Sequence, residues 1–193
     1  MESGIQSRIQ DLRVNSSVLE MAQLFGETVR DVISRSTGLD IQMSRSAQLV
    51  PTIRLAEDIG SFVSFFGNYS GLMVMNFQGP AALEIVAASL RQMGMDEDEI
   101  PQHHEAEDVR NAIGELTNHC IGMARIAMQK RYDVSADASI PAVVPLTGLY
   151  RLELKAVMRQ NDPCVRVVFT TPGHARFHME LCLEATQFVP INL

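Results

Sequence analysis

The sequence has no tryptophan and only three cysteines, Cys120, Cys164 and Cys182, which stand far apart and form no CxxC pair. An odd number of scattered cysteines argues against a disulfide framework and against a zinc site, so we expect reduced thiols and a cytoplasmic protein. Long apolar runs are also missing: none approaches the ~20 residues that cross a membrane. Residues 1–14 lack the apolar segment of a signal peptide. We therefore expect no membrane-spanning segment.

Basic residues are scarce, since 16 Lys and Arg stand against 23 Asp and Glu, a formal net charge of −7. The densest basic segment is Lys130-Arg131. Nucleic-acid phosphates would be repelled without a concentrated basic patch, so we expect no nucleic-acid partner. The 193 residues are 46% hydrophobic and 20% charged, which is typical of one packed domain. We expect residues 1–193 to form it.

Hydrophobic periodicity predicts helices at residues 16–37, 80–94 and about 105–130. Ser17 and Glu20 form a capping-box pattern at the start of the first helix. Pro80 suits the first turn of the second helix, where a missing N–H costs least. The third helix has acidic residues in its first turn and basic residues at its end, which favours the helix dipole. The acidic segment 95–104 is expected to be a solvated connector.

Alternating apolar residues bounded by turns predict strands at 52–55, 62–66, 72–77, 149–159, 165–171 and 176–183. Each half of the chain, about 15–78 and 105–185, then has a long helix, an extended connector and a three-stranded meander. We expect a pseudo-duplicated α+β domain with long helices packed on one face of an antiparallel sheet. Helix 80–94 and the acidic connector would join the halves, and residues 1–14 would be an N-terminal extension.

The third helix carries a polar line opposite its apolar stripe. The apolar stripe consists of Val109, Ile113, Leu116, Cys120, Met123 and Ala127. The polar line consists of Asn111, Glu115, Asn118, Gly122 and Arg125. Glu115 and Asn118 are three residues apart and therefore neighbours, and Gly122 leaves a bare spot that another molecule can approach. The alternative is an ordinary solvated helix face.

The segment 111–122, NAIGELTNHCIG, resembles the signature helix of the CheC/CheX/FliY family of chemotaxis phosphatases. That motif has an acidic residue or Ser, three residues, Glu, two residues, Asn, twenty-two residues and Pro. Glu115 and Asn118 match, and the count from Asn118 ends on Pro141. Asn111 departs from the motif, because it stands in the slot of the acidic residue or Ser.

The resemblance implies a hydrolase that removes the aspartyl phosphate of a CheY-type response regulator in two-component signalling. It implies that Asn118 orients the attacking water and that Glu115 anchors the partner through its active-site lysine. Asn111, Gly122 and Arg125 would contact the partner, and Pro141 would be a structural part of the motif. The regulator brings its own Mg²⁺, so neither a metal nor another cofactor is expected in this chain.

The first helix carries a degenerate copy of the motif. Its opening, NSSVLEMA at residues 15–22, resembles the first helix of the family, and Ser16, Glu20 and Gln23 have the motif spacing. Gln23 replaces Asn, however, and Ser46 stands where the proline would be. The chain therefore resembles the single-site CheX type, and Glu20 is interpreted as the capping-box acid.

Two further functions stay open on the sequence. The same fold occurs as a non-catalytic binding module in flagellar-switch relatives, and Asn111 is consistent with a loss of catalysis. A self-associating sensor is the other, since a strand such as 176–183 could pair across a homodimer.

Overall fold

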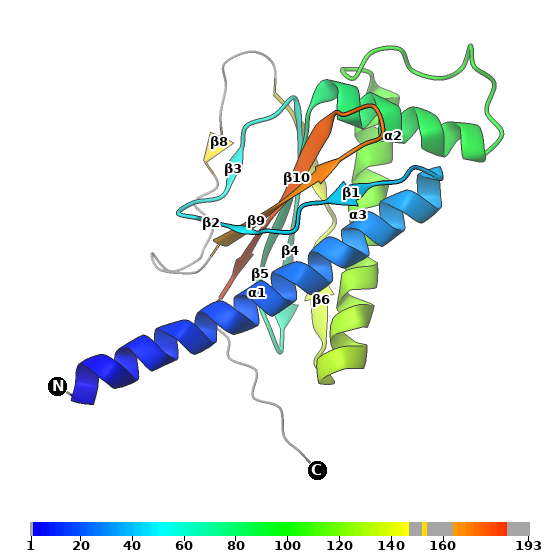
Figure 1. Cartoon of the computed structure of the whole chain (residues 1–193). Coiled ribbons are helices and arrows are strands. Elements are labelled where there is room, and N and C mark those ends of the chain that lie inside the picture. Colours follow the sequence, from blue (N-terminus) through cyan, green and yellow to red (C-terminus); the bar gives the residue numbers. More distant parts are fainter. Residues whose placement is uncertain (1, 147–151, 154–163, 185–193) are drawn as a thin grey trace.

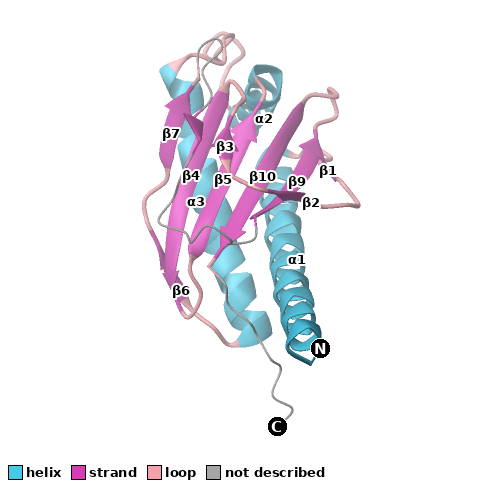
Figure 2. Ribbon diagram, turned by 90° about the vertical axis from the view of Figure 1, so that its left-hand side faces the viewer, coloured by secondary structure: helices cyan, strands magenta, loops and turns pink. Residues whose placement is uncertain are grey.

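A computed structural model describes residues 2–146, 152–153 and 164–184 of the chain, with side chains from residue 16 onward except at 152–153 (Figure 1). Its helices are α1 (Glu2–Thr37), α2 (Gly79–Gln92) and α3 (Glu107–Tyr132). All three lie on one face of an antiparallel sheet (Figure 2). This arrangement confirms the predicted α+β fold.

The main sheet has eight strands in the order β1-β9-β10-β5-β4-β6, with β2 also paired to β9 and β7 to β4. Its strands are β1 (Gln42–Met43), β2 (Gln48–Val50), β4 (Ile59–Gly67), β5 (Gly71–Phe77), β6 (Ala136–Ala138), β7 (Ala142–Pro145), β9 (Cys164–Thr170) and β10 (Arg176–Leu183). A separate two-stranded sheet joins β3 (Arg54–Leu55) to β8 (Leu152–Glu153).

The two halves of the chain exchange their short strands. Each half contributes a long hairpin, β4–β5 or β9–β10. These hairpins confirm the predicted strands at 62–66, 72–77, 165–171 and 176–183. After α1, β1 and β2 pair with β9, and after α3, β6 and β7 pair with β4. The predicted meander of the first half is therefore wrong at 52–55, because β3 pairs with β8 instead of β4. Most of the predicted strand 149–159 lies outside the described residues. The predicted meander of the second half is wrong at its described part, because β8 pairs with β3 and not with β9.

Helix α1 begins at Glu2 and not near residue 16. No proline interrupts the segment before Ser17, so the helix can continue through it, and the first part of α1 extends beyond the sheet (Figure 1). The predicted capping box of Ser17 and Glu20 is wrong, because both residues lie inside the helix, where backbone N–H groups already have partners. The Glu20 carboxylate instead accepts a hydrogen bond from the Tyr132 hydroxyl at 3.1 Å.

The core lies between the helices and the sheet. Phe77, Phe169 and Phe177 stack there, with ring centroids 5.2 Å and 4.8 Å apart along the row. The buried residues of α3 are Val109, Ile113, Thr117, Cys120, Ile121, Ala124 and Met128. The buried stripe is thus rotated from the predicted one, and Leu116, Met123 and Ala127 are only half-buried. Thr117 tolerates burial because its hydroxyl donates to the Ile113 carbonyl oxygen at 2.8 Å.

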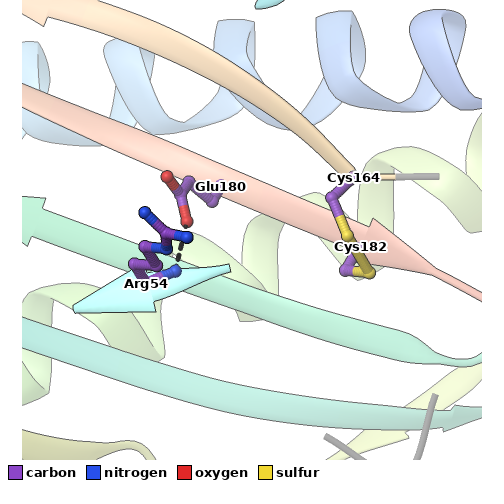
Figure 3. Close-up of a disulfide and its surroundings, with 4 residues drawn as sticks. All are labelled: Arg54, Cys164, Glu180 and Cys182. Carbon is purple, nitrogen blue, oxygen red and sulfur yellow. Dashed lines mark hydrogen bonds between the residues drawn. A yellow bond between two sulfur atoms is a disulfide. The ribbon is translucent and has the colours of Figure 1, made fainter. Parts of the chain in front are cut away.

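The expectation of three reduced thiols is wrong for two of them. Cys164 and Cys182 face each other across β9 and β10 and form a disulfide (Figure 3). They are 18 residues apart in sequence, and only the hairpin register brings them together. Cys120 is a free, fully buried thiol, and burial raises its pKa to about 12. The cysteine pattern therefore no longer argues for a reducing compartment.

Within the part of the chain that the structure describes, none of the helices has a stretch with the length and hydropathy needed to cross a bilayer.

Candidate functional site

The polar line of α3 faces outward as predicted. Asn111, Glu115 and Asn118 are exposed, because the opposite side of the helix is buried against the sheet and α1. Glu107 and Asp108 occupy the first turn of α3, where acidic groups favour the helix dipole. Side chains three and four residues apart are neighbours on a helix. The three polar side chains therefore form one continuous surface.

A hollow of about 560 Å³ opens between α3 and β7 beside this line. It is lined by Arg110, Asn111, Gly114, Glu115, Asn118, Ile140, Pro141 and Val143. Gly114 allows β7 to lie close to α3, since a Cβ at this position would lie only 3.2 Å from Val143 Cγ2. The structure thus places Pro141 beside the predicted pair of Glu115 and Asn118.

A second hollow of about 430 Å³ lies on the other side of Asn118, between α3 and β6. It is lined by Asn118, His119, Gly122, Met123, Arg125, Ile126, Gln129, Ser135 and Ala136. A Cβ on Gly122 would meet nothing within 4 Å, so the bare spot predicted there is open. Asn118 stands where the two hollows meet.

The side chains of Asn111, Glu115 and Asn118 are available to a partner. In residues 16–146 and 164–184, no hydrogen bond or ion pair joins the side chain of Asn111, Glu115 or Asn118 to another residue. A free carboxamide can donate and accept hydrogen bonds, and a free carboxylate can accept them. The arrangement can therefore orient a polar molecule and anchor a cation.

Arg125 has an internal role. Its Nε donates to the Ala136 carbonyl oxygen, and its Nη2 lies 3.3 Å from the Asp137 carboxylate. These contacts fix β6 against α3. A contact of Arg125 with a partner stays a prediction, but two of its donors are already engaged.

The degenerate line of α1 is arranged differently. The Gln23 amide nitrogen donates to the Glu27 carboxylate at 2.9 Å, and Glu20 accepts from Tyr132. A hollow of about 380 Å³ borders this line too, lined by Leu19, Gln23, Met43, Ser44, Arg45, Ser46, Ala47 and Val167. The equivalent hollow exists in the first half, but the side chains of Glu20 and Gln23 bond within the chain.

The described side chains contain no group of three or more His, Cys, Asp or Glu residues that would hold a metal ion.

Sequence reasoning missed Gly114, Ile126 and Ile140. The only signal in the sequence for Ile140 was its position next to Pro141. Its exposure depends on how β6 and β7 pair with β4, which the local sequence does not encode.

Comparison with protein families matches residues 16–192 to the family described as "Protein of unknown function (DUF3334)". No curated protein matches the chain. Several solved structures have the same fold. Chemotaxis protein CheX from Desulfovibrio desulfuricans is 23% identical, with a TM-score of 0.68 over 86% of this chain and 99% of that one.

The CheX of a CheX–CheY–BeF3–Mg²⁺ complex from Borrelia burgdorferi is 14% identical, with a TM-score of 0.62 over 84% of this chain and 96% of that one. Thermotoga maritima FliY is 17% identical, with a TM-score of 0.60 over 83% of this chain and 89% of that one. These likenesses confirm the fold that the signature helix implied.

Proposed function

The chain belongs to the family described as "Protein of unknown function (DUF3334)" and has the fold of CheX, CheC-like and FliY proteins, and we propose that it is a phosphatase of a CheY-type response regulator. The observation that carries the proposal is the exposed, internally unbonded pair of Glu115 and Asn118 beside Pro141. The CheX complex that contains CheY supports a partner of this type.

The residues suit the hydrolysis of an aspartyl phosphate. The Asn118 carboxamide accepts a hydrogen bond from a water and orients its oxygen toward phosphorus. The water oxygen bonds to phosphorus, the bond from phosphorus to the aspartate oxygen breaks, and the aspartate leaves as a carboxylate with inorganic phosphate as the other product. The receiver domain supplies Mg²⁺ and a lysine, so this chain contributes orientation and electrostatics.

Glu115 anchors the partner in this proposal. Its carboxylate pairs with the active-site lysine of the receiver. An exposed ion pair contributes little, about 0–1 kcal/mol, but it becomes stronger when docking excludes water. The shallow hollows on either side of Asn118 suit a protein surface rather than an enclosed small molecule.

Asn111 supports the second candidate, a binding module without turnover. The carboxamide of Asn111 keeps an acceptor oxygen in the slot of the acidic residue or Ser but lacks a carboxylate. If that group is needed for turnover, the chain binds a receiver and leaves its phosphate in place.

The test measures the decay of receivers from the same cell after phosphorylation with acetyl phosphate. The proposal predicts faster decay with the wild-type chain. It also predicts that Glu115→Gln weakens receiver binding and reduces the salt dependence of that binding, because one attractive charge pair is lost. Binding without faster decay would favour the binding module, and unchanged decay with every receiver would contradict the phosphatase.

A further inference from the structure

Two exposed isoleucines stand on either side of Asn118. Large hydrophobic side chains are exposed at seven of the described positions, Leu19, Leu49, Phe66, Met93, Met95, Ile126 and Ile140. Ile140 is 90% exposed, more than any other of the seven, and lines the hollow of Glu115 and Asn118. Ile126 is 45% exposed and lines the second hollow. Single exposed apolar residues are ordinary, but these two border the candidate site.

The backbone holds Ile140 firmly in place. It lies between β6 and β7, which both pair with β4. The preceding residue, Ser139, donates its N–H to the Ser64 carbonyl oxygen at 2.9 Å and accepts from the Ser64 N–H through its Oγ at 3.1 Å. Pro141 follows and restricts the conformation of residue 140. The side chain is thus presented to solvent on a fixed support, which lowers the entropy cost of using it in binding.

We propose that Ile140 is the apolar contact that holds the receiver domain against Glu115 and Asn118, with Ile126 as a weaker contact on the other side. This inference rests on the proposed function, since the partner is the same. Ile140 and Asn118 line one hollow, so a protein that reaches Asn118 also covers Ile140. One isoleucine on a polar rim offers too little apolar surface for a membrane or a stable dimer.

Ile140 adds apolar binding free energy, which the polar side chains of Glu115 and Asn118 do not provide. A buried apolar side chain contributes binding free energy in proportion to the area that it removes from water. It also keeps water away from the neighbouring ion pair, as the rim of an interface does for its centre. Ile140 therefore determines the affinity for the receiver more than the rate of the chemical step, which depends on Asn118.

The test measures the affinity for a CheY-type receiver from the same cell, charged with beryllofluoride and Mg²⁺. We expect Ile140→Ser to weaken binding about tenfold or more, and Ile140→Val to stay within about fourfold of wild type. Leu49→Ser is the matched control, because Leu49 is 62% exposed but lies in β2, near the opposite edge of the sheet. In the turnover assay, Ile140→Ser should raise KM and leave kcat nearly unchanged.

The outcomes separate this inference from the phosphatase proposal. Wild-type affinity in Ile140→Ser, or an equal loss in Leu49→Ser, overturns the role of Ile140 even if the wild-type chain is an active phosphatase. Weaker binding in Ile140→Ser without any wild-type turnover supports the contact and rejects the phosphatase. If the wild-type chain binds none of the receivers of its cell, both are overturned. Equal thermal unfolding of all variants excludes a folding defect as the cause.

Discussion

Asn118 and Gln23 carry the same carboxamide, each three residues after a glutamate on a long helix. The Gln23 side chain is one methylene longer, and the two carboxamides differ in their hydrogen bonds. The Gln23 carboxamide donates to Glu27 at 2.9 Å, whereas the Asn118 carboxamide has no hydrogen-bond partner among the described residues. The longer side chain also has more rotamers to lose when it orients a water. These differences favour a single working site, on α3.

His178 predicts a pH dependence of stability. Burial, and to a lesser extent the Arg166 guanidinium, lower the pKa of His178 from 6.5 to about 4. The Glu180 carboxylate lies 3.6 Å from His178 Nε2, but it already accepts two hydrogen bonds from Arg166, so that pair is close to neutral. The unfolded chain therefore binds one more proton than the folded chain between pH 6.5 and 4, and stability falls as the pH falls through this range.

The expected loss from His178 is about 3 kcal/mol at most. Denaturant unfolding at pH 7 and pH 4.5 measures it, with His178→Gln as the comparison. The variant should lose less stability than wild type over this range. An equal loss in both proteins would show that His178 does not titrate as the pKa shift requires.

Among the helices and strands, sequence patterns predicted the features that depend only on residues close together in the chain. The 3.6-residue hydrophobic period predicted helix α3 and the outward direction of Glu115 and Asn118, because both features are set by the periodicity within one helix. The start of α1 was missed, since a capping pattern at Ser17 does not reveal whether the residues before it are helical. The partner of β3 and the disulfide were missed because both depend on strand pairing between distant segments.

The packing of α3 predicts different effects at two of its glycines. Gly122→Ala should stabilise the fold by about 0.5–1 kcal/mol, because alanine favours a helix and the new Cβ meets nothing. Gly114→Ala should gain less or lose stability, because its Cβ would lie 3.2 Å from Val143. Denaturant unfolding of the two variants compares them. Equal gains would contradict the close contact between α3 and β7.

The β9–β10 hairpin predicts a stability that depends on redox state. The disulfide between Cys164 and Cys182 closes a short loop, which stabilises by roughly 3 kcal/mol, mainly through the unfolded chain. The wild-type chain should unfold at lower denaturant under reducing conditions. A double Cys164→Ser, Cys182→Ser variant should show no such difference between oxidising and reducing buffer. A wild-type chain that is indifferent to reductant would contradict the pairing.

At the scale of the whole molecule, the exchange of short strands gives each half the same type of hollow. Each hollow lies between a long helix and the strands that follow it in sequence, α1 with the segment after β1 and α3 with the segment around β7. Only the second of these combines a proline at the motif position with a free carboxamide. The fold therefore provides two equivalent positions, and the side chains favour function at one.

The rate of phosphate release from a phosphorylated receiver, measured with Asn118→Ala and with Gln23→Ala, shows which helix carries the working carboxamide. Each variant removes one exposed carboxamide from a helix surface, so both should fold like wild type, within about 0.5 kcal/mol. We expect Asn118→Ala to lose the acceleration, by roughly a hundredfold or more, and Gln23→Ala to keep it. Equal acceleration by the two variants, or a loss only in Gln23→Ala, would contradict the assignment of the site to α3.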